Sequence, residues 1–168
     1  MPEPTPSQTA GPYFAIGLTV TPQSELVPPG SAGAVRIAGR LLDGADDPVP
    51  DGVVEIWQAD ASGEYSPDFG FGRCGADDDG GFSFVTVKPG SVGGQAPHLN
   101  VLVFSRGLLK QLHTRMYFPD EEAANAADPV LAGVPEGDRA TLVAVPEGGG
   151  LRFDVRFQGE GQTVFFAT

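Results

Sequence analysis

Short segments in which apolar and polar residues alternate recur along the chain, separated by turn-forming residues, while long helical periodicity is nearly absent. This pattern is typical of strands that bury one face, and its repetition predicts an all-β sandwich or barrel. In the last segment, apolar residues occupy every second position from Leu151 to Phe157 and charged residues stand between them. The predicted strands cover residues 35–42, 53–60, 81–87, 98–106, 112–118, 140–145 and 151–159.

The segment before the first predicted strand has no strong periodicity. Residues 1–33 are therefore interpreted as an extended N-terminal arm that must pack on another surface to be ordered. Residues 34–168 are interpreted as a single domain, because neither an internal repeat nor a second domain is evident. One short helix is predicted in DEEAANAA, with Asp120 as its cap and two glutamates in its first turn.

Composition narrows the classes of function. The chain has 168 residues, 40% of them hydrophobic, which is enough for one domain with a sizeable core. Its 10 basic and 22 acidic residues give a net charge of −12, which argues against nucleic acid or an anionic membrane surface as a partner. No apolar run approaches the ~20 residues of a membrane span. An anionic substrate would be repelled at long range and would need a specific local cation.

The residues suited to chemistry are few. Cys74 is the single cysteine, which excludes an intrachain disulfide and a cysteine metal site and makes a cytoplasmic protein the simplest interpretation. His98 and Asn100 share a strand face, but asparagine is a poor ligand for a transition metal, so His98 is either a weak metal ligand or a hydrogen-bonded strand histidine. Arg106 shares that face if the strand is unbroken. It is either a solvated strand end or an anion contact.

Five sequence motifs, in this order, resemble the intradiol ring-cleavage dioxygenases: TPSQTAGPY, VEIWQADASGEY, TVKPG, APHLNV and TRMYFPDE. The resemblance extends from Thr5 to Phe166 and implies a β-sandwich, in agreement with the strand pattern. In this family two tyrosines and two histidines, the latter as His-x-His, hold Fe(III). The matching positions in this chain are Tyr65, Val92, His98 and Asn100.

Two of these four positions therefore lack a suitable donor, because valine has none and an asparagine amide is weakly basic. The resemblance is thus to the family's non-catalytic α chain, and it implies that this chain has no catalytic residue and holds no metal. It further implies that Fe(III) is bound by a homologous β chain in an αβ hetero-oligomer, and that the arm of residues 1–33 packs on that partner.

The resemblance also implies that Thr9, Gly11, Pro12 and Arg106 line the pocket in which the partner's iron and O₂ cleave a small aromatic acid. Thr9 has the alternative role of capping the arm. Two rival hypotheses remain open. One is a self-sufficient dioxygenase with a variant iron site, and the other is a non-enzymatic β-sandwich that serves as a binding or scaffold module.

Overall fold

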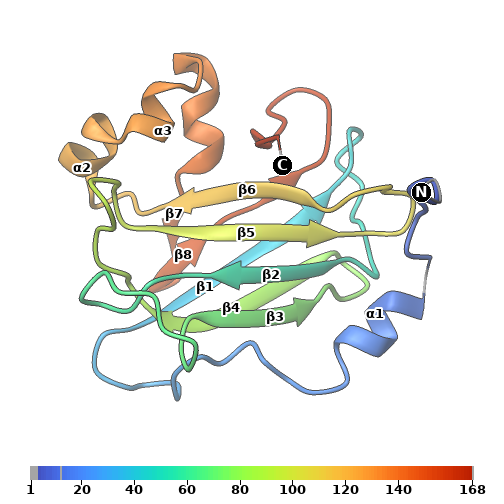
Figure 1. The fold of residues 1–168 in the computed structure, drawn as a ribbon, viewed down its shortest axis with the longest axis horizontal. Coiled ribbons are helices and arrows are strands. Elements are labelled where there is room, and N and C mark those ends of the chain that lie inside the picture. Colours follow the sequence, from blue (N-terminus) through green and yellow to red (C-terminus); the bar gives the residue numbers. More distant parts are fainter. Residues whose placement is uncertain (1–3, 12, 168) are drawn as a thin grey trace.

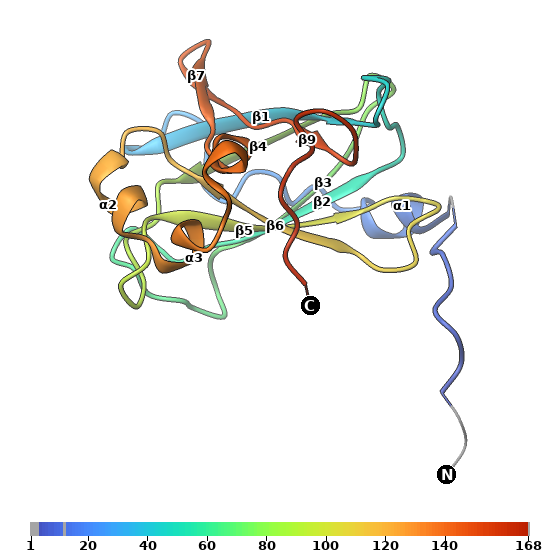
Figure 2. The same ribbon diagram turned by 90° about the horizontal axis from the view of Figure 1, so that it is seen from above.

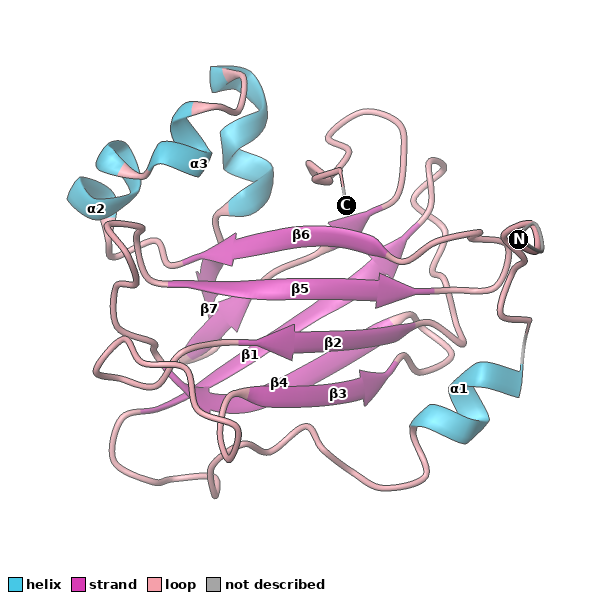
Figure 3. Ribbon diagram, viewed as in Figure 1, coloured by secondary structure: helices cyan, strands magenta, loops and turns pink. Residues whose placement is uncertain are grey.

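The computed structural model describes residues 4–11 and 13–167. Two β-sheets face each other, with α2 and α3 at one end and α1 near the other (Figures 1 and 3). The strands are β1 (Ala34–Leu42), β2 (Val53–Trp57), β3 (Phe71–Gly75), β4 (Gly81–Val87), β5 (His98–Phe104), β6 (Leu112–Tyr117), β7 (Val145–Glu147), β8 (Gly150–Arg152) and β9 (Val155–Arg156). The helices are α1 (Tyr13–Leu18), α2 (Glu122–Ala127), α3 (Pro129–Ala132) and a 3-10 helix (Glu136–Leu142).

The first sheet has the strand order β3-β2-β5-β6, and all of its neighbours are antiparallel. The second has the order β4-β1-β8-β7, and β9 also pairs with β1. The core lies between the sheets, where alternate residues of each strand are buried, as in β4. Its largest fully buried members include Phe84, Ile37, Leu41, Leu99, Met116 and Phe118. The predicted all-β sandwich is confirmed.

The strand boundaries differ from the prediction in several places, and the predicted strands 53–60 and 98–106 end early, at Trp57 and Phe104. β3 was missed, because FGRCG is short and carries two glycines among its five residues. Residues 140–142, predicted as part of a strand, end the 3-10 helix instead. The last predicted strand is split into β8 and β9, and Phe153 is buried between them. The carbonyl oxygen of Phe153 approaches β1 so closely that a Cβ on Gly39 would lie 1.9 Å from it.

The helix predicted in DEEAANAA is present as α2, but Asp120 does not cap it. The carboxylate of Asp120 instead accepts a hydrogen bond from Lys88 Nζ at 2.8 Å. The sequence did not predict α1, α3 or the 3-10 helix. A fully buried aspartate, Asp128, caps α3 and also accepts a hydrogen bond from the backbone of Ala96 at 2.8 Å. It thereby joins α3 to the loop that leads into β5.

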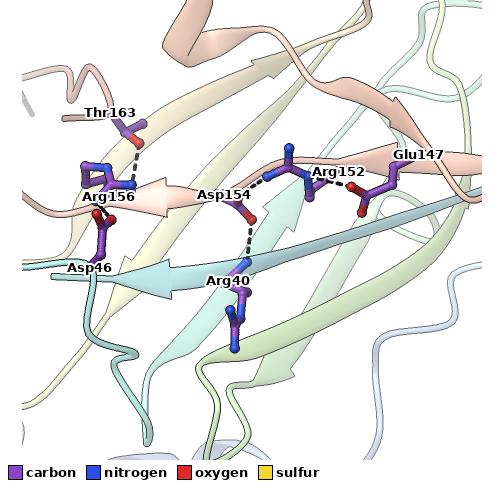
Figure 4. A network of polar contacts seen from close by, with 7 residues as sticks. All are labelled: Arg40, Asp46, Glu147, Arg152, Asp154, Arg156 and Thr163. Carbon is purple, nitrogen blue, oxygen red and sulfur yellow. Dashed lines mark hydrogen bonds and ion pairs between the residues drawn. The ribbon is translucent and has the colours of Figure 1, made fainter. Parts of the chain in front are cut away.

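A chain of ion pairs fastens the last strands to the rest of the second sheet (Figure 4). Arg152 contacts Glu147 at 3.0 Å and also pairs with Asp154. Asp154 accepts a hydrogen bond from the backbone of β1 at 3.1 Å. Arg156 pairs with Asp46 in the loop after β1. These contacts lie on the outer side of the molecule and serve the fold.

The N-terminal segment has two parts. The first described residues extend beyond the sandwich (Figure 2), and Gln8, Thr9 and Ala10 lie against the loop after β5. Gln23 and Glu25 form β-bridges with Arg73 and Val85 of the chain's own strands. β1 begins at Ala34. Within the part of the chain that the structure describes, no helix has the length and apolar character needed to cross a membrane.

Candidate functional site

The four residues at the family's iron-ligand positions lie where β5 begins, at the left end of the first sheet in Figure 1. We call Tyr65, Val92, His98 and Asn100 the ligand-position cluster. His98 and Asn100 stand on β5 itself. Tyr65 comes from the loop after β2, and Val92 from the loop before β5.

The loop that carries Tyr65 is shaped by local hydrogen bonds. Asp60 Oδ1 accepts from the Ser62 hydroxyl at 2.7 Å and from the Ser62 backbone at 2.9 Å. The hydrogen bond from the Ser62 side chain, with further backbone hydrogen bonds, lowers the pKa of Asp60. Gly63 has a φ of +87°, and a Cβ there would lie 2.3 Å from the Ser91 carbonyl oxygen. The two loops are therefore in contact, and Tyr65 remains 52% exposed.

Each polar member of the cluster makes a hydrogen bond to another protein group. Asn100 Nδ2 donates to Tyr65 Oη at 3.1 Å. His98 is only 5% exposed, and its Nδ1 donates to the Ala96 carbonyl oxygen at 2.7 Å. Burial lowers the pKa of His98, so the buried ring is neutral at pH 7. His98 is thus a hydrogen-bonded strand histidine, and this contact involves Nδ1 only.

A cation lies beside this cluster. Arg115 on β6 is the cross-strand partner of Asn100. Its Nη1 donates to Gln95 Oε1 at 2.8 Å and to Tyr117 Oη at 3.3 Å. Tyr117 donates in turn to Asp128 Oδ1 at 3.2 Å, and burial raises the pKa of Tyr117 to about 12. The sequence analysis did not single out Arg115, although the motif TRMYF placed it two residues before a buried tyrosine.

These residues do not fit Fe(III). Val92 offers no donor atom, and the amide of Asn100 already donates to Tyr65. The guanidinium of Arg115 adds a positive charge that would repel a trivalent cation. The donor set of the ligand-position cluster therefore disagrees with the family's iron chemistry.

The other end of β5 is different in character. β5 ends at Phe104, so the expectation that one strand carries both His98 and Arg106 is wrong. Residues 105–107 form a turn in which Gly107 has a φ of +87°, and we call these residues the Arg106 turn. The Arg106 side chain is 61% exposed, and its Nε lies 3.1 Å from Asp51 Oδ2. Asp51 was also missed by the sequence analysis.

The N-terminal arm reaches the Arg106 turn. Thr9 Oγ1 accepts a hydrogen bond from the Gly107 backbone at 2.7 Å, so the Thr9 hydroxyl keeps its own hydrogen for another acceptor. Gly11 has a φ of +72° with open space around its Cα, and Pro12 lies outside the described residues. Between arm and turn is a hollow of about 180 Å³. It is lined by Gln8, Ala10, Phe104, Ser105, Leu108, Leu109, Lys110 and Gln111.

The structure thus brings Thr9 and Arg106 together but separates them from the ligand-position cluster. The six residue steps from His98 to Phe104 span about 20 Å at the rise of a β-strand. The two groups flank opposite ends of β5 (Figure 1). Within this chain, therefore, the Arg106 turn does not face the place where the family holds its iron.

Comparison with known proteins identifies the relatives of this chain. A family model described as "Dioxygenase" matches residues 10–159. The chain is 42% identical to the protocatechuate 3,4-dioxygenase alpha chain of Burkholderia cepacia, over 96% of both chains. It is 34% identical to the beta chain from the same organism, over 77% of this chain and 66% of that one.

A solved structure adds evidence on the fold. The dioxygenase domain of a dioxygenase carbohydrate-binding protein fusion from Streptomyces sp. SirexAA-E has a TM-score of 0.64 and 27% identity. The match covers 94% of this chain and 99% of that domain. An intradiol ring-cleavage dioxygenase from Tetranychus urticae, 17% identical, has the same fold with a TM-score of 0.64. On these matches, the chain belongs to the intradiol ring-cleavage dioxygenase family.

Proposed function

We propose that this chain is the non-catalytic α subunit of a protocatechuate 3,4-dioxygenase. In this proposal a homologous β chain holds Fe(III), and the assembled enzyme uses O₂ to cleave protocatechuate to β-carboxy-cis,cis-muconate. The likeness to named α and β chains supports an αβ assembly. The iron is assigned to the partner because the ligand-position cluster of this chain has one tyrosine and one histidine where the family has two of each.

The observation that carries the proposal is the state of the Arg106 turn. Arg106 is an exposed guanidinium on a chain whose net charge is −12. Protocatechuate is a catechol with a carboxylate, and a guanidinium is the side chain best matched to a carboxylate in shape and charge. Arg106 therefore supplies the local cation that an anionic substrate needs, and the Thr9 hydroxyl beside it supplies a further hydrogen-bond donor.

The proposed partner surface includes the arm and α1. No residue of α1 is buried, although five of the six residues in YFAIGL are apolar. Tyr13 and Ile16 are 80% and 66% exposed, respectively. An exposed apolar helix next to a projecting arm is costly in water and is stabilised by burial against another chain. In the proposed enzyme this contact sets the Arg106 turn beside the iron of the β chain.

Thr9, Gly11, Pro12 and Arg106 are the proposed pocket residues of this chain. Gly11 allows the arm to approach a ligand closely, because it has positive φ and no side chain. We also propose that the protein is cytoplasmic, because a single cysteine suits a reducing compartment.

Co-expression with a β chain tests the proposal against both rivals. The chain is purified alone and together with the β chain, and iron per chain, oligomeric mass and O₂ uptake with protocatechuate are measured. We expect activity in the complex only and iron in proportion to the β chain. Stoichiometric iron in the isolated chain would instead favour a self-sufficient enzyme. A β chain whose activity is the same without this chain would favour a scaffold module.

A further inference from the structure

Arg106 is anchored by one carboxylate within the described residues. Its Nε lies 3.1 Å from Asp51 Oδ2, in the loop between β1 and β2. We propose that Asp51 is a positioning residue that orients the Arg106 guanidinium toward the carboxylate of the substrate. This inference rests on the proposed function, since it assigns to Asp51 a role through Arg106 and no contact with substrate.

The Asp51 backbone has an unusual conformation. Its φ is +58°, a value that L-residues seldom adopt and that aspartate tolerates better than most. The next residue, Gly52, is packed so tightly that a Cβ there would lie 2.3 Å from Leu41 Cδ1. Asp51 thus precedes a tightly packed position at the start of β2, and its own side chain is 25% exposed.

The negative charge of the partly buried Asp51 carboxylate is offset by the positive charge of Arg106. Asp51 Oδ1 is buried, and the structure gives it no hydrogen-bond partner among the described residues. A buried carboxylate oxygen without a donor is unfavourable unless a nearby cation offsets its charge. The contact with Arg106 is the ion pair that the structure gives to Asp51. A strained, partly unsatisfied residue held in this way is more typical of a functional position than of a surface contact.

The Asp51–Arg106 pair leaves the two terminal nitrogens of the guanidinium free to bind another carboxylate. Asp51 engages Nε, and neither terminal nitrogen of Arg106 has a hydrogen-bond partner among the described residues. Those two nitrogens form the end of the planar fork, which binds a carboxylate with two parallel hydrogen bonds. Asp51 thus holds the guanidinium from behind, and a substrate carboxylate meets it end-on. Direct contact with the fork outweighs repulsion from the more distant Asp51 carboxylate.

The test is a double-mutant cycle in the assembled αβ enzyme. Asp51→Asn keeps the shape of the side chain and a residue that tolerates positive φ, while it removes the charge. We expect KM for protocatechuate to rise about two- to fivefold, the factor that a partly exposed ion pair contributes. KM for plain catechol should stay unchanged. In an Arg106→Gln background, Asp51→Asn should have no further effect.

Asp46→Asn is the matched control. Asp46 also has positive φ, lies in the same loop, and pairs with an arginine, Arg156, that belongs to the ion-pair chain of the second sheet. We expect this variant to keep the KM values of the parent for both substrates. Asp51→Gly is a second variant that preserves positive φ if the asparagine variant folds poorly, and thermal unfolding of every variant is measured alongside.

The outcomes separate this inference from the proposed function. If Arg106→Gln lowers kcat/KM for protocatechuate while both Asp51 variants behave as the parent, only the positioning role of Asp51 is overturned. If Asp51→Asn impairs both substrates equally, or adds its effect to Arg106→Gln, Asp51 is structural and the inference fails. If Arg106→Gln changes neither substrate, the pocket role of Arg106 fails and the inference fails with it.

Discussion

The two ends of β5 differ in how far their polar side chains are engaged by other groups of the same chain. At its start, the ligand-position cluster is closed by its own hydrogen bonds, with Asn100 on Tyr65 and His98 on a backbone carbonyl. At its far end, the Arg106 turn presents an exposed guanidinium. Beside it, the Thr9 hydroxyl accepts a hydrogen bond from Gly107 and can still donate its own hydrogen. An exposed guanidinium with free N–H groups is able to bind an anion.

The arginines near the two ends of β5, Arg115 and Arg106, also differ in their surroundings. Near the ligand-position cluster, Arg115 contacts Gln95 and Tyr117, so its charge is enclosed by protein groups. At the other end, Arg106 has a single aspartate behind it and solvent in front. Two arginines flanking the same strand thus have opposite roles. The Arg115 guanidinium is hydrogen-bonded to uncharged side chains of its own chain, whereas the Arg106 guanidinium pairs with one aspartate and is 61% exposed.

The largest effect is expected on iron binding, when metal-ligand side chains are restored at the ligand-position cluster. The wild-type chain should bind no stoichiometric Fe(III), and Val92→Tyr with Asn100→His should bind it poorly while Arg115 remains. Adding Arg115→Met should restore binding, because it removes the competing positive charge. Iron per chain and a visible phenolate-to-iron absorption band measure the result. Arg139→Met, which removes an arginine elsewhere in the chain, is the control.

Equal iron binding by the double variant with and without Arg115 would contradict the role assigned to that arginine. A coloured, iron-loaded wild-type chain would contradict the whole account of the closed end. Turnover is not expected in any of these variants, because residues around the ligands also tune a metal site.

The next largest effect is expected from a substitution in the Arg106 turn. Arg106→Ala should lower kcat/KM for protocatechuate by roughly ten- to a hundredfold, because a charged hydrogen bond contributes about 1.5–3 kcal/mol. Plain catechol, which has no carboxylate, should be affected much less, and iron content should not change. Lys110→Ala is the control, since it removes a cation that lines the hollow beside the arm. Equal loss for both substrates in an intact complex would show that Arg106 is not the anion contact.

How far the sequence predicts this molecule depends on how local each feature is. β4 matches the predicted segment 81–87 at both ends, because GFSFVTV alternates cleanly and a glycine precedes its strand residues. β3 has no such pattern, since glycines interrupt it, and only pairing with β2 makes it a strand. The split between β8 and β9 likewise follows from the close approach of Phe153 to β1, which no local pattern reveals.

The candidate site also combines residues that the sequence reveals with residues that only the structure reveals. Sequence motifs singled out Tyr65, His98 and Asn100, and Thr9 and Arg106 as well. The partners that decide their chemistry come from elsewhere in the chain. Arg115 meets Asn100 through the β5–β6 register, and Asp51 meets Arg106 through the loop before β2. Such contacts depend on the assembled sheets, so one sequence alone does not show them.

A smaller effect should follow when the arm is released from the Arg106 turn. Thr9→Val keeps the shape of the side chain but removes the acceptor for the Gly107 backbone. A neutral hydrogen bond contributes about 0.5–1.5 kcal/mol, so kcat/KM should fall roughly two- to tenfold. Thr5→Val, on the same arm, is the control. If Thr9→Val matches the parent while Arg106→Ala does not, the arm is held by other contacts.

The smallest effect concerns the pKa of His98 in the ligand-position cluster. Burial, with a further contribution from the charge of Arg115, holds the pKa of His98 below its usual value of about 6.5. The unfolded chain then binds more protons than the folded chain just below that pH, so the free energy of unfolding should be fully retained above about pH 6.5 and decrease as pH falls. Ring-proton NMR titration of His98 measures the shift directly.

Arg115→Met should raise the pKa of His98 but leave it below the usual value, because burial is the larger cause. The pKa of His113 should rise as well, since the same two causes lower it. Arg106→Ala, at the far end of β5, should change neither titration. If Arg115→Met left His98 unchanged, the charge of Arg115 would not act on the ligand-position cluster, and the contrast between the two ends of β5 would rest on hydrogen bonding alone.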